Sequence, residues 1–424
     1  MLEKPKLFVE RREVWVVVGF FLVLLVARLG WLYGECREFI LKPFYFTQAE
    51  VIEQYTTTRE GERYTLSHFY APALDLHFVS RIYVDEPLVG RSVRLKLFPS
   101  ERIGFVDYLR RAYIPAKINR LYPSKASTLS TLSDAIASQH ENPTMQRFYQ
   151  AIFLATPLPK ELRGQIATLG VSHLVALSGL HLAILSLMLF GLLRPLYRGL
   201  QQRFFPYRFE MMDVGLVVLL ILGGYLYMVG MPPSLLRSYV MMVLGWLMLL
   251  LGVELVSFGF LGVTLMGILV LFPKLLFSVA FWFSMAGVFY IFLLLKYFEG
   301  LGRWWMSLLI SVGLFVLMLP IVHLIFPLVS PWQLLSPWLS LVFTFFYPLS
   351  LGLHLLGIGG VLDGGLMALF SLESASREVL LGGWWGVGYL LLSLGAVYSR
   401  WLFWLLVGVA LLGMGAMFMP FMLS

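Results

Sequence analysis

From Val171 to its end, this chain is almost continuously apolar, and that stretch limits the fold more than any other feature. A helix needs about 20 apolar residues to cross the hydrocarbon core of a bilayer. We expect spans near 171–193, 213–230, 235–251, 255–272, 275–296, 304–326, 383–398 and 401–422, with less regular apolar stretches at 337–358 and 361–372. With 59% hydrophobic and 13% charged residues and a mean hydropathy of +0.81, the chain is predicted to be a polytopic α-helical membrane protein rather than a soluble enzyme.

Two clusters of basic residues predict the orientation of the apolar segments. One cluster precedes a first apolar stretch, 14–27, and contains Lys4, Lys6, Arg11 and Arg12. The other follows the 171–193 segment and contains Arg194, Arg198, Arg203 and Arg208. Short loops rich in Lys and Arg stay in the cytoplasm. We therefore expect residues 1–34 to form an uncleaved transmembrane anchor with a cytoplasmic N-terminus, and the segment up to residue 170 to lie outside.

Residues 35–125 have the composition of a soluble domain. Apolar and polar residues alternate at 64–70, 74–78 and 93–97, as in short strands. Four or five such strands predict a small extracytoplasmic β-barrel, an OB-like domain. Residues 126–170 are predicted to form juxtamembrane amphipathic helices broken at prolines.

The run His173-Leu-Val-Ala-Leu-Ser-Gly-Leu-His181 places two imidazoles and a hydroxyl at membrane depth. Polar groups are costly there, so they are kept mainly for a pathway or a binding site. On one continuous helix, His173, Ser178 and His181 would lie on roughly the same side, and Gly179 permits close backbone approach or a local break. Two interpretations stay open: a polar stripe that lines a conduit, and hydrogen bonds that join neighbouring helices.

A second run, Gly230-Met-Pro-Pro-Ser-Leu-Leu-Arg237, combines helix-start signals with a cation. Pro233 pre-sets the first turn of a helix, and Ser234 is expected to cap it. The amides of that turn and Arg237 together predict an anion-attracting site. The alternative is an arginine that reaches to the membrane interface.

Further polar groups are scattered through the apolar half. His354 lies in the glycine-rich stretch 352–360, and Asp363 precedes two glycines, which predicts a broken helix. For His323 we expect a hydrogen-bonded structural role. Only six basic residues follow Met211, so the sequence shows no continuous basic lining. A pore within one chain and a pore built by a homodimer both stay open.

The segment 91–125 carries nine basic residues against two acidic ones, with five aromatic residues interleaved. Basic groups follow a phosphate backbone while aromatic faces stack bases, so single-stranded nucleic acid is one expected ligand. The alternatives are a face against anionic membrane lipid and a solvated face. The candidate DNA contacts are Arg91, Arg94, Lys96, Arg102, Arg110, Arg111 and Lys117.

The first run resembles the HLLAISGLHV-type motif of the ComEC-type competence proteins, which carry single-stranded DNA across the cytoplasmic membrane during natural transformation. The second run is similar to the family's glycine, then proline-serine-x-leucine-arginine pattern. Trp282 stands where the family usually has a glutamine. There is no His-x-His-x-Asp-His run, so the resemblance is to a form without the C-terminal metallo-β-lactamase-like domain.

The resemblance implies a channel for one incoming DNA strand in the bacterial cytoplasmic (inner) membrane, with 171–424 as the channel domain. The implied partners, besides the DNA strand, are an extracytoplasmic DNA receptor and a cytoplasmic helicase-like ATPase. We expect no catalytic residue, metal or cofactor, because neither a GxxxxGK[ST] loop nor a Cys/His cluster is present. The candidate pathway residues are His173, Ser178, Gly179, His181, Pro233, Ser234 and Arg237.

Two other functions account for some of these residues. Ala176-Leu-Ser178-Gly resembles the glycine-x-serine-glycine of rhomboid-type intramembrane proteases, with His323 or His354 as base, although an alanine replaces the first glycine. The other alternative is a transporter of small or lipid-linked solutes.

Overall fold

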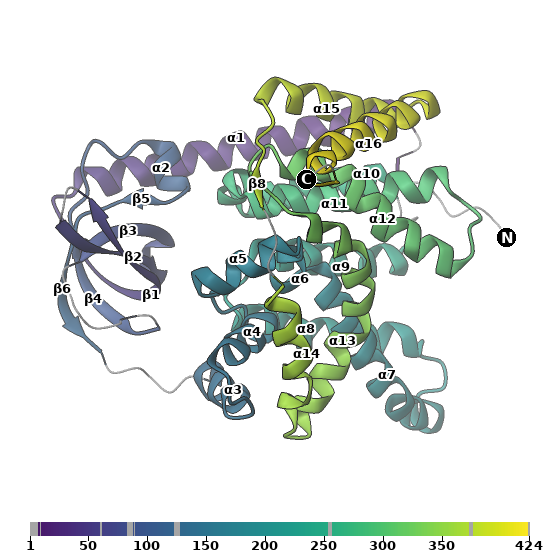
Figure 1. Ribbon diagram of the computed structural model, residues 1–424, viewed down its shortest axis with the longest axis horizontal. Coiled ribbons are helices and arrows are strands. Elements are labelled where there is room, and N and C mark those ends of the chain that lie inside the picture. The colour runs from purple at the N-terminus through teal and green to yellow at the C-terminus, as the bar shows by residue number, and fades with distance from the viewer. Residues whose placement is uncertain are drawn as a thin grey trace. The chain divides into compact units, whose positions relative to one another are not determined.

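The structure, a computed structural model, describes residues 7–8, 10–59, 62–82, 88, 90–122, 128–252, 257–372 and 376–422. Lys4 and Lys6 of the first basic cluster, and Lys125 of the basic segment 91–125, lie outside the described residues. The chain divides into two compact units, whose elements are labelled in Figure 1. One unit comprises Glu10–Thr131 and Leu265–Val279, and the other comprises Met1–Val9, Leu132–Thr264 and Ala280–Ser424.

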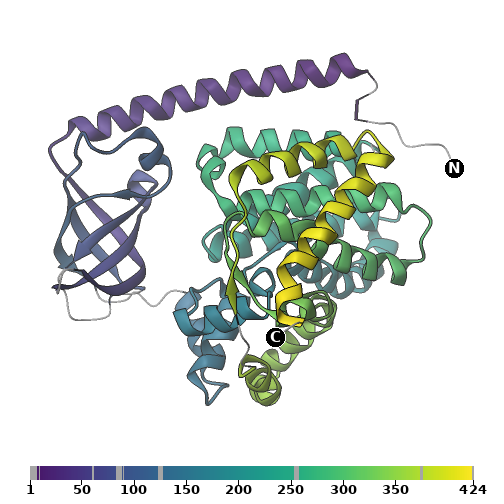
Figure 2. The same cartoon turned by 45° about the horizontal axis from the view of Figure 1, so that its top comes forward.

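The first unit combines a long helix with a six-stranded sheet. Its elements are α1 (Arg11–Leu41), β1 (Tyr45–Arg59), β2 (Glu62–Ala71), η1 (Pro72–Leu74), β3 (Leu76–Ile82), β4 (Ser92–Leu97), α2 (Phe105–Leu109), β5 (Ala112–Tyr113), β6 (Ala116–Leu121) and η2 (Pro273–Phe277). The strand order is β5-β3-β2-β1-β4-β6, and only β3 and β5 pair in parallel. Figure 2 shows how strongly the strands curve. The end strands β5 and β6 do not pair with each other in the described part of the chain, so the sheet is open in this order.

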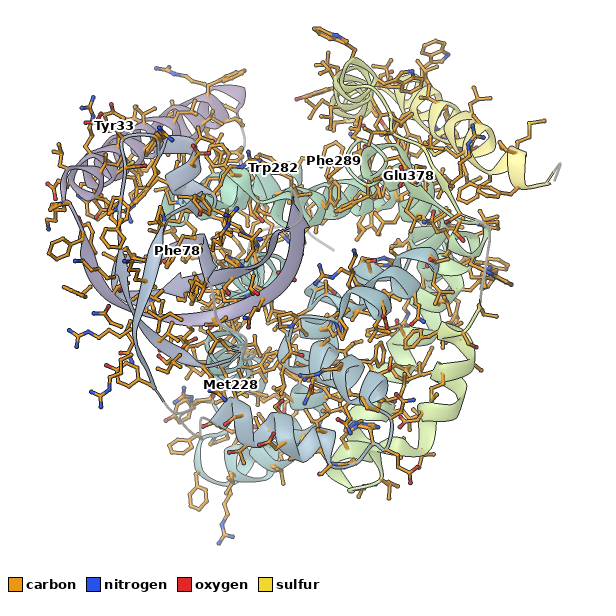
Figure 3. All side chains as sticks on the ribbon, turned by 60° about the vertical axis from the view of Figure 1, so that its left-hand side comes forward. Tyr33, Phe78, Met228, Trp282, Phe289 and Glu378 are labelled. Atoms are coloured by element: carbon orange, nitrogen blue, oxygen red, sulfur yellow. The ribbon has the colours of Figure 1, made fainter. Side chains whose placement is uncertain are left out.

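The core of the sheet follows from the alternation in the sequence. Val93, Leu95 and Leu97 are fully buried on β4, as the pattern predicted. Phe69 and Phe78 stack with ring centroids 5.2 Å apart, and Figure 3 shows Phe78 within the curve of the strands. Removing each such side chain from water contributes about 1.5–3 kcal/mol, so a few rings and branched chains hold this small sheet together.

The longest strand and the full length of the first helix were not predicted. β1 is mostly polar in sequence, and its inward positions include the small Ala49 and Val51, which give only a weak alternation. Helix α1 continues past residue 34 to Leu41, because Cys36 and Phe39 pack into the core of the sheet. The end of the apolar anchor therefore does not mark the end of the helix.

The rest of the chain is mainly helical. Its elements are α3 (Thr128–Ala137), α4 (Pro143–Leu154), α5 (Lys160–Thr168), α6 (Ser172–Val175), α7 (Gly179–Phe204), α8 (Glu210–Met228), α9 (Pro233–Leu250), α10 (Phe258–Leu271), α11 (Val279–Tyr297), α12 (Arg303–Val322), β7 (Leu328–Val329), η3 (Pro331–Leu335), α13 (Ser336–Leu355), η4 (Gly359–Leu362), α14 (Asp363–Phe370), β8 (Arg377–Glu378), α15 (Gly383–Ala396) and α16 (Arg400–Met422). The short strands β7 and β8 pair antiparallel.

Eight of the described helical segments are long and apolar enough to cross a membrane. They are Arg12–Leu41, Gly179–Phe204, Glu210–Met228, Pro233–Leu250, Val279–Tyr297, Arg303–Val322, Pro331–Leu355 and Arg400–Phe421. Two shorter apolar segments, Phe258–Leu271 and Gly359–Phe370, accompany them. Together they confirm the prediction of a polytopic helical membrane protein. The chain between His354 and Asp363 leaves helical geometry at Gly357, where φ is +77°, so the helix is broken there as predicted.

The predicted span at 171–193 is wrong in its boundaries. The chain leaves helical geometry between α6 and α7, and α7 then continues through Pro195 to Phe204. His173 therefore does not lie on the same helix as His181. Arg194, Arg198 and Arg203 lie within α7 rather than in a loop, whereas Arg208 lies in the connection before α8 as predicted. The Arg194 side chain pairs with Glu210, the first residue of α8, at 2.6 Å.

Candidate functional site

The first motif begins a helix instead of lying within one. Ser178 is extended, with φ −133° and ψ 177°, and α7 starts at the next residue. The Ser178 amide donates to Nδ1 of His181 at 3.2 Å, and the Ser178 hydroxyl lies 3.1 Å from the same nitrogen. Because Nδ1 accepts the amide proton, a neutral His181 carries its own proton on Nε2. That buried Nε2 has no hydrogen-bond partner among the described residues, and the ring packs edge-to-face with Tyr347 at 4.7 Å.

Arg237, near the start of α9, is a buried cation whose partners are neutral. Only 5% of its surface is exposed. Its Nε donates to the hydroxyl of Ser284 in α11 at 2.7 Å, and Nη2 donates to the Ser238 hydroxyl at 2.6 Å. Nη1 lies 2.9 Å from the sulfur of Met241. Within the described part of the chain, no carboxylate pairs with this guanidinium. A buried charge without a counter-charge is strongly unfavourable, so an anion beside Arg237 would stabilise the site.

The starts of α7 and α9 meet at this guanidinium. A Cβ atom on Gly179 would lie 2.7 Å from the Ser238 hydroxyl oxygen and 3.1 Å from Arg237 Nη2, so the approach requires glycine. The Ser234 hydroxyl donates to the carbonyl oxygen of Leu177 at 2.5 Å and so joins the two helix starts. Helix N-termini carry partial positive charge and bind phosphate groups. We call Ser178, Gly179, His181, Ser234, Arg237 and Ser238 the α7–α9 site.

The structure separates one predicted pathway residue from the others. His173 lies in α6, where its Nε2 is 3.2 Å from the Ser340 hydroxyl of α13. Pro233 opens α9 as predicted. The prediction that Ser234 caps α9 is wrong, because Pro232 occupies the cap position and the serine hydroxyl serves the contact with α7.

The contact between Ser178 and His181 has the geometry of a helix cap rather than of a nucleophile and its base. Nδ1 of His181 already accepts the Ser178 amide, and no described group orients Nε2. The histidines that the protease interpretation requires bond elsewhere. His323 Nδ1 lies 2.9 Å from the Phe326 carbonyl oxygen, and His354 Nδ1 lies 2.6 Å from that of Ser350.

In the first unit, β1, β4 and β6 carry neighbouring basic and aromatic side chains. Lys96 lies opposite Phe46 on β1 and opposite Lys117 on β6. Its Nζ is 4.1 Å from the ring centroid of Phe44 and 5.6 Å from that of Phe46, and both rings are exposed. Arg94 lies 5.7 Å from the Phe46 ring. We call these five residues the β4 surface; it combines cations with exposed aromatic rings.

The other predicted DNA contacts lie on different elements. Arg91 directly precedes β4, while Arg102 and Arg110 lie on either side of α2. Arg111 lies beside the sheet: burial, helped by the positive charge of this arginine, lowers the pKa of His68 to about 4. The predicted contacts therefore do not share one face of the strands.

His140 joins two groups that the sequence shows only as scattered polar residues. It contacts both Asp363 and His354. His140 lies in the connection between α3 and α4 and belongs to no motif, so no local signal marks it. Among the described residues, no group of three or more His, Cys, Asp or Glu side chains is arranged to hold a metal ion.

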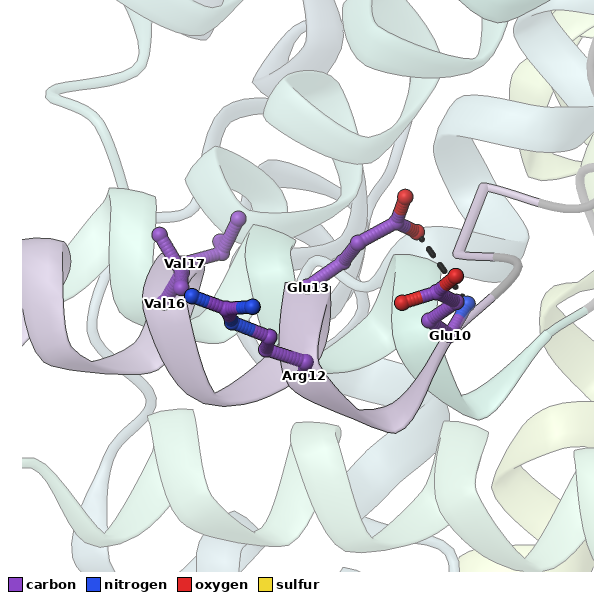
Figure 4. Close-up of a pocket in the computed structure, with 5 residues that line it drawn as sticks. All are labelled: Glu10, Arg12, Glu13, Val16 and Val17. Atoms are coloured by element: carbon purple, nitrogen blue, oxygen red, sulfur yellow. Dashed lines mark hydrogen bonds between the residues drawn. The ribbon is translucent and has the colours of Figure 1, made fainter.

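A recess at the start of α1 holds none of the predicted site residues. Glu10, Arg12, Glu13, Val16 and Val17 line it (Figure 4). The Glu10 amide donates to the Glu13 carboxylate at 3.3 Å, which is the arrangement of a capped helix start.

The fold and the α7–α9 site define a multi-pass membrane protein with a buried cationic centre. The chain belongs to the competence protein family, because the family model described as "Competence protein" matches residues 156–423. This confirms the resemblance to the ComEC-type proteins. An uncharacterized protein of Aquifex aeolicus (strain VF5) is 32% identical over 190 residues, which are 44% of this chain and 42% of that protein. The chain thus matches less than half the length of this relative. No solved structure matches the chain.

Proposed function

We propose that this protein is a channel in the bacterial inner membrane that passes one strand of incoming DNA during natural transformation. The observation that carries the proposal is the α7–α9 site. There, a buried guanidinium with neutral partners lies where two helix N-termini meet. A phosphodiester carries one negative charge and accepts hydrogen bonds, so each phosphate of a passing strand would supply the missing counter-charge. Transient neutralisation lowers the electrostatic barrier for a polyanion inside the membrane domain.

The β4 surface is proposed as the outer contact for the strand. Exposed rings accept stacked bases without sequence preference, while Arg94, Lys96 and Lys117 follow the phosphates. An OB-like architecture of the sheet is supported by the continuity of β5 and β6. These strands are separated only by Ile114-Pro115, and they pair with β3 and β4 respectively. The same stretch of chain therefore reaches both ends of the sheet.

The orientation, energy source and partners follow from the same proposal. The N-terminus is cytoplasmic and the sheet unit is extracytoplasmic, as the basic clusters predict. A DNA receptor outside delivers the strand, and a helicase-like ATPase inside pulls it, because the chain itself has no phosphate-binding loop motif.

Transformation with labelled DNA in an Arg237→Gln strain tests the proposal. Glutamine keeps hydrogen-bonding capacity but removes the charge, so we expect cytoplasmic delivery of label to fall at least tenfold at unchanged protein level. Arg303→Gln is the matched control, since Arg303 is an exposed arginine at the start of α12, and it should be neutral. Normal delivery in Arg237→Gln contradicts the proposal. Altered envelope composition with intact DNA uptake in a deletion strain would instead favour the solute transporter.

A further inference from the structure

Three ionisable side chains outside the α7–α9 site form one buried chain of hydrogen bonds. His140 Nδ1 lies 2.9 Å and 3.0 Å from the two carboxylate oxygens of Asp363, the first residue of α14. His140 Nε2 lies 2.9 Å from Nε2 of His354, in the last turn of α13. His354 Nδ1 lies 2.6 Å from the Ser350 carbonyl oxygen. The His140 side chain is fully buried, and that of Asp363 is 17% exposed.

Counting the hydrogens shows that the three side chains hold one proton more than an ionised aspartate and two neutral histidines would carry. A carbonyl oxygen only accepts, so His354 Nδ1 must carry hydrogen. If Asp363 is ionised, His140 Nδ1 also carries hydrogen, and the two facing Nε2 atoms have lone pairs directed at each other. One proton must then lie between them. If Asp363 is protonated instead, it donates to His140 Nδ1, and His140 Nε2–H donates to His354. Both arrangements contain the same number of protons and are neutral overall.

Losing that proton leaves a net negative charge and only one hydrogen for the two contacts of His140, so either the contact with Asp363 or the 2.9 Å contact with His354 lacks its hydrogen bond. In a buried site an unpaired charge and an unmade hydrogen bond are both costly. The side chains must then separate. Because His140 belongs to the α3–α4 connection and its partners belong to α13 and α14, separation loosens that junction.

The surroundings hold the three side chains in place. The Tyr149 ring of α4 stacks on His140 with centroids 4.4 Å apart, and its buried phenol has no hydrogen-bond partner among the described residues. Burial and the charge of Asp363 raise the pKa of Tyr149, so the phenol stays protonated. Gln139 donates to the His354 carbonyl oxygen and accepts from the Gly359 amide. Among the described residues, the titratable groups in contact with His140 are Asp363, His354 and Tyr149.

The spacing fits a proton better than a metal ion. Two nitrogen–metal bonds of about 2.0–2.1 Å at a tetrahedral angle need roughly 3.3 Å between the nitrogens, whereas the two Nε2 atoms are 2.9 Å apart. Asp363 lies on the opposite side of the His140 ring from His354, so its carboxylate does not add a ligand at that point.

We propose that His140, His354 and Asp363 form a proton-binding site that locks the α3–α4 connection to the broken helix α13–α14. The proton is shared along the chain of bonds and leaves to water through Asp363, whose side chain is 17% exposed. Its release separates His140 from its partners and opens the junction. The stabilisation is present at low pH and is lost as the pH rises, because the closed site binds the proton and the open one does not.

Hydrogen exchange of the full-length protein in lipid nanodiscs tests the proposal. We expect protection at 138–150 and 354–366 to fall as the pH rises, after correction for intrinsic exchange. The limit is tenfold per pH unit for one released proton. Asp363→Asn removes the balancing charge and His354→Gln removes the shared proton, so both variants should lose this pH dependence. His323→Gln, a buried histidine bonded to a carbonyl outside the site, should keep it.

Wild-type protein whose protection does not change with pH overturns the proposal without any variant. An unchanged wild-type slope in both Asp363→Asn and His354→Gln overturns it as well. Zinc ions that raise wild-type protection, with loss of that effect in His354→Gln, would identify a metal site instead and also overturn it.

Discussion

Replacing Gly179 by alanine tests whether the first turn of α7 must pass directly over the Arg237–Ser238 pair. The new Cβ would lie 2.7 Å from the Ser238 hydroxyl oxygen, a distance that forces the hydroxyl away from Arg237 Nη2. A hydrogen bond to a charged group contributes about 1.5–3 kcal/mol. Alanine offsets up to about 1 kcal/mol of this through its higher helix propensity. We expect a net loss of about 1–2 kcal/mol in stability.

Gly191 provides the matched control on the same helix. A Cβ there meets nothing within 4 Å, so Gly191→Ala should be neutral or slightly stabilising. Thermal unfolding in detergent and transformation frequency are measured for both variants. Gly179→Ala should be destabilised and should transform at least tenfold less efficiently.

A double-mutant cycle isolates the steric cause. Ser238→Ala removes the hydroxyl that meets the new methyl group, and the remaining Ser238 Cβ would be 3.4 Å from it, an ordinary contact. The combined variant should therefore lose less stability than the sum of the two single losses, with a coupling of about 1 kcal/mol or more. If Gly179→Ala behaves like Gly191→Ala, the packing of α7 on Arg237 described above is wrong.

Three further outcomes follow from the sheet unit. Phe46→Ala should weaken binding of single-stranded DNA to the full-length protein about five- to 150-fold, since base stacking contributes about 1–3 kcal/mol; unchanged affinity would remove the β4 surface from the proposal. Lys117→Gln should lower the slope of log affinity against log salt by about 0.7, as measured by anisotropy titrations at several salt concentrations. Because the folded His68 binds its proton only near pH 4, protection of β2 and β3 against hydrogen exchange should fall as the pH drops from about 6.5 to 4, by up to about 3 kcal/mol. His68→Leu should flatten this dependence.

The spans and part of the sheet could be predicted because their signals are local. The apolar run marks the membrane helices, and Val93, Leu95 and Leu97 reveal β4 through alternation alone. The helix start at Pro233 is also visible in the residue types. Local structure can therefore be predicted from the sequence where the neighbouring residues in the chain decide the conformation.

The arrangement of the sites could not be predicted, because it depends on contacts between distant segments. Nothing near Gly179 indicates that Ser238 lies against it, and nothing near His140 indicates Asp363. The prediction that Ser234 caps α9 was wrong for the same reason. Its hydroxyl donates instead to the carbonyl oxygen of Leu177, which lies just before α7. Strand β1 was not predicted, because tertiary packing rather than its own polar sequence makes this segment a strand.

Cross-linking of a DNA strand in transit tests the central claim most directly. A photoreactive amino acid replaces Met241, whose sulfur touches the Arg237 guanidinium, and another replaces Leu247 on α9 as control. Light is applied while cells take up labelled DNA. We predict that the label becomes attached to the chain from position 241 and not from position 247. Normal entry of label into the cytoplasm with no attachment at 241 would show that the strand does not pass Arg237.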